Sequence, residues 1–229
     1  MKQPAGHPQD SGAGSVGLAS LGDFLAKVLV LFAHPRPDRS EVNQPLFETA
    51  QRVEGVTAVD LYADYPDFNI DIDREQARLA AHDVIVFQHP LYWYSSPAIM
   101  KEWQDLVLEH GFAYGHDATA LRGKVFLNAI TTGAKPEAYS EAGMNHTELR
   151  SLLGPFERTA DLCGMRYLAP FVLFGAGRAL EQDRLGAHRN AYDCLLKALV
   201  AERLDLEKAA KSAILTDVLQ DLVLNGEAI

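Results

Sequence analysis

Five short apolar runs of strand length recur along the chain, and segments with helical spacing separate them. The runs cover residues 27–34 (KVLVLFAH), 57–63 (TAVDLYA), 83–89 (DVIVFQH), 123–131 (GKVFLNAIT) and 165–175 (MRYLAPFVLFG). Because apolar residues follow one another without alternation, both faces of each strand must be covered, as in a parallel sheet between helices. The pattern predicts an α/β fold with a doubly wound five-stranded parallel sheet and helices on both faces.

Apolar helical faces are found between and after these runs. The first face comprises Val42, Leu46, Ala50 and Val53, and the second comprises Ile99, Trp103, Leu106 and Val107. Residues 180–213 are predicted to form a long helical region whose apolar side contains Tyr192, Leu195, Leu196 and Leu199. Residues 214–229 (ILTDVLQDLVLNGEAI) add an amphipathic tail whose partner the sequence does not identify.

One domain is predicted between two smaller segments. Residues 1–24 are rich in Gly, Ser, Ala and Pro and lack the apolar core of a secretory signal, so we expect a flexible tail. Residues 25–202 contain the predicted sheet, and residues 203–229 are expected to form a helical C-terminal extension. No apolar run reaches the length of about 18 residues that a membrane span needs.

Charge and composition argue against several classes of function. The 229 residues carry a formal net charge of -10, from 31 acidic and 21 basic side chains, and an unpatterned acidic surface repels nucleic acid. Cys163 and Cys194 are too far apart in sequence for a CxxC metal site and fit small core residues in a reducing compartment. We therefore expect no nucleic-acid partner, no bound metal and a cytoplasmic location.

Doubly wound sheets bind ligands beyond the carboxyl ends of their strands, which directs attention to three loops. The first loop covers residues 34–47 (HPRPDRSEVNQPLF) and contains no GxGxxG dinucleotide fingerprint. Ser40, the Asn43 side chain and the free N–H groups that open the next helix are suited to a phosphate monoester. His34, Arg36 and Arg39 add nearby charge. In the alternative interpretation, Ser40 or Asn43 only caps the helix.

The second loop crowds aromatic side chains where a strand passes into a helix. Residues 88–103 read QHPLYWYSSPAIMKEW, and Ser96 followed by Pro97 fits the start of that helix. Tyr92, Trp93 and Tyr94 can stack on a planar ring or enclose it. The alternative is a core or dimer contact.

The third loop covers residues 131–146 (TTGAKPEAYSEAGMNH). Thr131 and Thr132 supply hydroxyl groups, and Gly133 allows close approach of a ligand to the backbone. Three polar side chains farther along can lean over the same pocket, namely Tyr139, Asn145 and His146. A phosphate site, an aromatic wall and a threonine-glycine edge together describe a pocket for flavin mononucleotide (FMN).

Several motifs together resemble the flavodoxin-like NAD(P)H:quinone oxidoreductase family. They are His34-Pro35 with Ser40 and Asn43, YPDFNIDI at residues 65–72, residues 88–103, HGFAYG at residues 110–115, and TTG at residues 131–133. Within that family, the chain most resembles the ancillary proteins of glutathione-regulated potassium-efflux antiporters. The resemblance covers roughly residues 27–200.

This resemblance implies a tightly bound FMN and a homodimer with flavin sites near the subunit boundary. The residues that it implies for FMN binding are His34, Ser40, Glu41, Val42, Asn43, Leu91, Tyr92, Trp93, Tyr94, Thr131, Thr132, Gly133 and Ala134. Tyr139 matches a catalytic tyrosine of the family, whereas the histidine position holds Asn145, with His146 one residue later. Tyr139 and His146 are therefore the predicted catalytic residues. Ala134 stands where the family usually has a second glycine.

The resulting hypothesis is a cytoplasmic FMN-dependent dehydrogenase in which NADH or NADPH and then a quinone-like acceptor exchange hydride with flavin N5 in turn. One alternative is a regulatory subunit of a potassium-efflux antiporter, which would place the protein at the periphery of the inner membrane through its partner. A one-electron carrier is disfavoured, because no hydroxyl-rich TxTGxT run follows the first strand. An interaction module without flavin is the remaining alternative.

Overall fold

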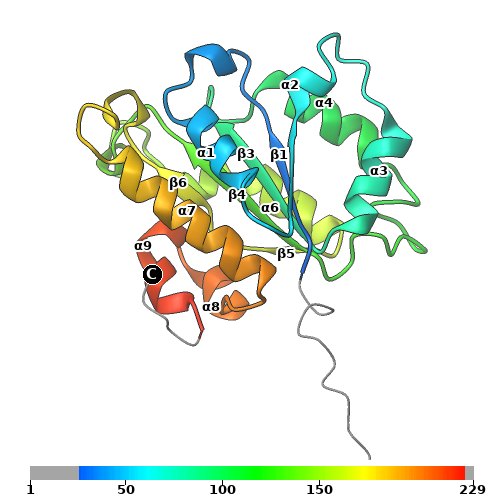
Figure 1. Ribbon diagram of the computed structural model, residues 1–229. Coiled ribbons are helices and arrows are strands. Elements are labelled where there is room, and N and C mark those ends of the chain that lie inside the picture. The colour runs from blue at the N-terminus through cyan, green and yellow to red at the C-terminus, as the bar shows by residue number, and fades with distance from the viewer. Residues whose placement is uncertain (1–25, 225–229) are drawn as a thin grey trace, which may run out of the picture.

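The computed structural model describes residues 26–224, so the tail predicted at residues 1–24 lies outside the described residues. Six parallel strands form one sheet in this part of the chain (Figure 1). They are β1 (Val28–Phe32), β2 (Val56–Asp60), β3 (Val84–Pro90), β4 (Val125–Thr131), β5 (Arg166–Tyr167) and β6 (Phe171–Leu173). The order is β2-β1-β3-β4-β5, with β6 also paired to β4. The predicted doubly wound α/β fold is confirmed.

Helices cover both faces of the sheet (Figure 1), and a hydrophobic cluster lies between the sheet and the helices on each face. On one face, α1 (Asn43–Ala50) packs against α7 (Leu185–Val200) over the side chains of Val28, Val30, Val84 and Val86. On the other face, α3 (Ile72–Ala81), α4 (Ala98–Val107) and α6 (Gly154–Leu162) cover Leu29, Leu31, Ile85 and Phe87. Every residue of β1, β3 and β4 is buried, which explains why these strands read as continuous apolar runs.

The second predicted strand ends earlier than expected. β2 lies at the edge of the sheet and buries only Val59, and residues 61–64 form the short helix α2 (Leu61–Asp64). The Asp60 carboxylate caps this helix by accepting hydrogen bonds from the N–H groups of Tyr62 and Ala63 at 3.0 and 3.3 Å. The local cap therefore converts the end of an apolar run into a helix.

The fifth predicted strand is divided into β5 and β6. Phe126 pairs with Tyr167, whereas Ala129 pairs with Phe171, so three steps along β4 face four steps along the partner. This extra residue is a bulge, and Pro170 beside it has no N–H to donate to the sheet. The single strand predicted over residues 165–175 was therefore wrong at its centre.

The predicted helical region at residues 180–213 is also interrupted. α7 ends at Val200, Glu202 adopts a left-handed conformation with φ 53°, and α8 (Leu206–Lys211) begins after the Asp205 cap. α9 (Leu215–Leu222) then packs its apolar face onto the same core as α7 and α8. The Thr216 hydroxyl accepts from Val172 N at 2.7 Å and donates to Val172 O at 3.1 Å, which covers the edge of β6.

The shorter elements complete the description. They are α5 (Leu149–Leu152) and the 3-10 turns η2 (Pro37–Arg39), η3 (Pro136–Ala138) and η4 (Ala176–Arg178). Within residues 26–224, none of the helices combines the length and the apolarity that crossing a bilayer requires. Since the three 3-10 turns follow β1, β4 and β6, they all lie at the carboxyl edge of the sheet.

Candidate functional site

A cavity of about 390 Å³ opens at the carboxyl edge of the sheet. It brings together residues of all three predicted loops, namely His34, Ser40, Glu41, Val42, Asn43, Leu91, Tyr92, Thr131, Thr132 and Gly133. Arg39, Pro90, Ala176 and Gly177 also line it. Five predicted site residues lie outside the lining, namely Trp93, Tyr94, Ala134, Tyr139 and His146.

His34 joins the first loop to the second. Its side chain is buried, and its Nδ1 accepts a hydrogen bond from the N–H of Arg36 at 3.1 Å. The neutral ring therefore carries its proton on Nε2, which lies 3.3 Å from the Tyr92 hydroxyl. Burial lowers the pKa of His34, so the imidazole is neutral at neutral pH.

Asn43 occupies the first position of α1 at the floor of the cavity, where its side chain is 4% exposed. Its Nδ2 donates to the Thr131 hydroxyl at 2.8 Å, and its backbone carbonyl accepts from Gln88 Nε2 at 2.8 Å. Its Oδ1 is buried and has no hydrogen-bond partner among the described residues. A buried acceptor without a partner is costly, which favours a ligand that donates to it.

Ser40 caps the helix that Asn43 begins. Its Oγ accepts hydrogen bonds from the backbone N–H groups of Asn43 at 2.9 Å and of Gln44 at 3.4 Å. Ser40 therefore makes the capping contacts of the alternative interpretation, and it also lines the cavity. The exposed guanidinium of Arg39 makes no hydrogen bond or ion pair with the rest of residues 26–224 and remains free for an anion.

The aromatic loop is a tight hairpin with a strained backbone. Tyr92 and Ser95 exchange two backbone hydrogen bonds of 3.1 and 3.0 Å, and the two residues between them are left-handed, with φ 48° at Trp93 and 63° at Tyr94. Asn-Gly is the usual pair at such a turn, and each bulky residue costs about 1–2 kcal/mol there. Trp93 is 93% exposed, so the hairpin displays its aromatic rings and does not pack them into the core.

The helix after this hairpin begins one residue later than predicted. α4 starts at Ala98, Pro97 takes the capping position, and Ser96 makes no side-chain cap. Leu91 N donates to Thr131 O at 2.8 Å, which continues the pairing of β3 with β4 beyond Pro90. The second and third loops are therefore held together by backbone as well as by side chains.

The start of the third loop is fixed against the segment that follows β6. Thr132 N donates to Leu173 O at 2.9 Å, and Ala176 N donates to Thr132 O at 2.8 Å. A methyl group added at Gly133 would meet no atom within 4 Å, so the space above it is open. The φ of Ala134 is not in the left-handed region, so this residue is unstrained where the related family usually has glycine.

The two predicted catalytic residues stand apart from the cavity. Tyr139 is half-buried with its ring centroid 5.7 Å from that of Phe174, and His146 is exposed with φ 50°. Asn145, the neighbour of His146, accepts a hydrogen bond from the Tyr94 hydroxyl at 3.2 Å, while its Nδ2 is buried without a partner. Asn145 thus links the third loop to the aromatic hairpin.

Sequence reasoning missed the contribution of a fourth loop. Ala176 and Gly177 line the cavity, although they follow the last strand of the sheet. They reach the first loop because α7, which they precede, packs against α1. The sequence FGAGR at residues 174–178, two glycines directly after a strand, was the available signal.

Comparisons with known proteins agree with this architecture. Residues 26–196 match the model of a family described as having a flavodoxin-like fold. The chain is 48% identical over 167 residues to the glutathione-regulated potassium-efflux system ancillary protein KefG of Enterobacter sp. (strain 638), covering 73% of this chain and 91% of that protein.

Two solved structures are similar in fold and in sequence. General stress protein 14 from Treponema denticola, in complex with FMN, has a TM-score of 0.71 and 34% identity, covering 76% of this chain and 99% of that one. A P. pentosaceus protein described as an NADPH-quinone reductase has a TM-score of 0.65 and 30% identity, covering 74% and 97%.

Proposed function

The chain belongs to the flavodoxin-like fold family, and on this premise we propose that it is an FMN-dependent NAD(P)H dehydrogenase that reduces quinones or similar acceptors. The observation that carries the proposal is the cavity in which four loops meet around the unpartnered Asn43 Oδ1. The similarity to an FMN complex and to an NADPH-quinone reductase supports the same cofactor and reaction class.

The residues of the cavity fit the three parts of FMN. Arg39 suits the phosphate because its exposed guanidinium is unpaired, and the partial positive charge at the N-terminus of α1 adds to it. The N–H groups of Asn43 and Gln44 at this terminus already donate to Ser40 Oγ. Asn43 Oδ1 suits a ribityl hydroxyl, since it is a buried acceptor that lacks a donor. Leu91 and Tyr92 suit the wall of the ring, and Trp93 and Tyr94 extend this wall as exposed aromatic surface.

The third loop offers donors for negative charge on the ring. The backbone N–H groups of Gly133 and Ala134 donate to no acceptor within the described part of the chain, and Gly133 lines the cavity. Preorganised N–H groups of this kind stabilise developing charge without reorganisation. Bound FMN supplies the two-electron hydride chemistry, and the residues around it bind and orient the reactants.

Tyr139 and His146 keep their predicted catalytic roles as part of this proposal. Tyr139 belongs to the loop whose first residues line the cavity, and its ring contacts Phe174 beside the fourth loop. His146 and Asn145 form the end of the same loop, and Asn145 already contacts Tyr94. The exposed aromatic hairpin and the third loop are the surfaces that a second subunit would cover in the proposed homodimer.

A second candidate function is that of an ancillary subunit of a glutathione-gated potassium-efflux antiporter. The observation that favours it is the 48% identity to KefG over most of that protein. In this case the flavin site is retained and redox turnover is secondary to docking. The protein would be cytoplasmic and peripheral to the inner membrane through its partner.

The test of the main proposal is the visible absorption spectrum of protein purified without added cofactor. We expect a flavin spectrum that bleaches on anaerobic addition of NADH or NADPH and returns when a quinone is added. A colourless protein that takes up no FMN would contradict the proposal. Flavin that bleaches without being reoxidised by any quinone, combined with co-purification of an antiporter, would instead favour the ancillary subunit.

A further inference from the structure

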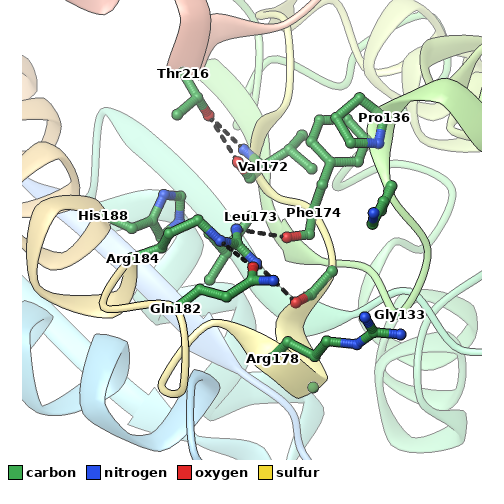
Figure 2. A pocket seen from close by; sticks show the side chains of 13 residues that line it. Gly133, Pro136, Val172, Leu173, Phe174, Arg178, Gln182, Arg184, His188 and Thr216 are labelled. Carbon is green, nitrogen blue, oxygen red and sulfur yellow. Dashed lines mark hydrogen bonds between the residues drawn. The ribbon is translucent and has the colours of Figure 1, made fainter.

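A second cavity of about 610 Å³ adjoins the first at the same edge of the sheet. The two cavities share Gly133 and Gly177, so one ligand can extend from the first into the second. Figure 2 shows Gln182, Arg184 and His188 on one side, Arg178 near Gly133 at the bottom, and Thr216 of α9 at the top. The fourth loop and the C-terminal extension therefore build this cavity together.

The second cavity is cationic. Its lining contains Lys135, Arg178 and Arg184 but no carboxylate, although the whole chain has a net charge of -10. The side chains of Lys135 and Arg178 belong to exposed residues, and their cationic groups form no hydrogen bond or ion pair with any residue that the structure describes. Unpaired cations that gather at a cavity of an acidic protein favour an anionic ligand.

Arg184 adds a charge that its hydrogen bonds do not neutralise. Its Nη1 donates to Phe174 O, its Nη2 to Gly175 O and its Nε to Gln182 Oε1, each at 2.9 Å. All three acceptors are neutral, so the guanidinium keeps its positive charge beside the cavity. Arg184 also holds Gly175 in its left-handed turn, with φ 60°, and is therefore a positioning residue for the fourth loop.

His188 supplies an unused polar atom in the same lining. The side chain is 6% exposed, its ring stacks on Phe171 with 4.5 Å between centroids, and its Nε2 has no hydrogen-bond partner in the described structure. Burial, and to a smaller extent the charge of Arg184, lowers the pKa of His188 to about 4. The ring is therefore neutral at neutral pH, and Nε2 is a buried polar atom of the lining whose hydrogen-bonding capacity is unused.

We propose that the second cavity binds a phosphate group of the nicotinamide dinucleotide donor, with Lys135 and Arg178 contacting the phosphate. This assignment rests on the proposed function, because the donor must reach FMN in the adjoining cavity. A quinone-like acceptor carries no such anion and gives the two free cations no role. The shared chemistry is a phosphate ester, from either the pyrophosphate bridge of both nucleotides or the 2′-phosphate found only in NADPH.

The test is calorimetric titration of FMN-loaded protein with NADP⁺ and NAD⁺, which bind without turnover. Arg178→Gln and Lys135→Gln, called the cavity variants below, each remove one cation of the second cavity. The matched controls are Arg122→Gln and Lys27→Gln, because both residues are exposed and precede strands at the opposite edge of the sheet. We expect each cavity variant to bind NADP⁺ about tenfold more weakly, which is the effect of losing one charge-assisted contact. Both control variants should bind NADP⁺ with the wild-type affinity.

The same titrations identify the source of the phosphate. A loss confined to NADP⁺ assigns the cavity to the 2′-phosphate, and equal losses for NADP⁺ and NAD⁺ assign it to the pyrophosphate; both outcomes support the proposal. Wild-type affinity in Arg178→Gln and Lys135→Gln, or no binding of NADP⁺ to the wild-type protein, overturns it. Loss of FMN from the cavity variants also overturns the proposal, because Lys135 and Arg178 would then bind FMN and not the nucleotide.

Failure of this assignment and failure of the proposed function give different results. A protein that takes up no FMN contradicts the dehydrogenase itself. If NADPH bleaches the flavin-loaded protein but the cavity variants bind NADP⁺ with the wild-type affinity, only the phosphate subsite is contradicted.

Discussion

Two polar regions of the molecule differ in how completely their hydrogen bonds are satisfied. On the α3 and α4 face, the fully buried carboxylate of Glu75 accepts from Tyr65 Oη at 2.6 Å, from Trp103 Nε1 at 3.0 Å and from the Arg78 guanidinium. At the carboxyl edge of the sheet, buried atoms of Asn43, Asn145 and His188 have no partner. Strain is also present at this edge, in the left-handed Trp93, Tyr94 and His146.

The motif YPDFNIDI, although part of the family resemblance, stabilises the fold and does not line the cavity. YPDFNIDI, residues 65–72, contributed to the family resemblance, but its tyrosine serves the Glu75 network, and its final Asp71 caps α3 by accepting from Arg74 N at 3.0 Å. Burial, followed by the negative Glu75, raises the pKa of Tyr65 to about 12. Completed networks are typical of the core, whereas unpartnered buried atoms and strain mark the edge where a ligand is expected.

The largest expected effect comes from breaking the satisfied region. Glu75→Ala removes the acceptor shared by Tyr65, Trp103 and Arg78 and should lower the free energy of unfolding by about 3 kcal/mol. The buried Trp103 Nε1 and the Tyr65 hydroxyl lose their acceptor, whereas Arg78 keeps its ion pair with Asp64. Urea denaturation measures the change. In the matched control, Glu207→Ala, the exposed ion pairs with Arg166 and Lys211 are lost and the free energy of unfolding should change by less than about 1 kcal/mol. Equal stability of the two variants would contradict the account of Glu75.

The strained hairpin predicts a change of opposite sign. Replacing Trp93 with Asn and Tyr94 with Gly fits the backbone of the turn and should raise the free energy of unfolding by about 1–2 kcal/mol. The same double variant should weaken FMN binding or quinone reduction, because the exposed aromatic surface is lost. Phe68→Gly is the control, since Phe68 is also left-handed (φ 64°) but lines neither cavity. If the double variant binds FMN and reduces quinones like the wild-type protein, the aromatic rings of the hairpin take no part in either.

An effect of about tenfold is expected when the unpartnered acceptor is removed. Asn43→Ala should weaken FMN binding by that factor, the equivalent of one buried hydrogen bond, as measured by fluorescence titration of flavin into flavin-free protein. The control is Thr49→Ala, which removes a buried polar side chain from the same helix away from the cavity lining. If FMN affinity stays at the wild-type value in Asn43→Ala, the cofactor does not depend on this residue.

The two regions also show which parts of the fold the sequence could predict. Strands β1, β3 and β4 were recognisable because both of their faces are buried. The division of β5 from β6 was not, because a one-residue bulge leaves the apolar pattern unchanged. The end of α7 was missed for a similar reason, since Leu204 and Ala209 continue the buried pattern beyond the left-handed turn at Glu202.

Prediction of the site had a corresponding limit. The three loops were predictable because parallel strands end at one edge, and ten of the predicted binding residues line the cavity there. Ala176 and Gly177 reach the cavity through the packing of α7 on α1 and through the hydrogen bond from Ala176 N to Thr132 O. The two glycines of residues 174–178 indicate a turn but not which loop it meets. The second cavity likewise depends on Thr216 of α9, far along the chain from the cations opposite it.

The smallest expected effect is a shift in the titration of one histidine. Burial lowers the pKa of both His89 and His188 to about 4. His89 has both ring nitrogens engaged, by Pro90 O at 3.0 Å and Asn128 Nδ2 at 3.2 Å, whereas His188 Nε2 has no partner. A phosphate in the second cavity favours the protonated ring, so NADP⁺ should raise the pKa of His188 and leave that of His89 unchanged.

Nuclear magnetic resonance of the two imidazole rings between about pH 3.5 and 7 measures this difference. The sign of the stability change follows from the same shift. Both rings are neutral in the folded protein and protonate more readily when unfolded, so their contribution to stability is complete above about pH 6.5 and is lost as the pH falls towards 4. NADP⁺ should reduce the share of this loss of stability at low pH that comes from His188. Equal shifts of the two rings would indicate a general change in the fold and would remove His188 from the phosphate subsite.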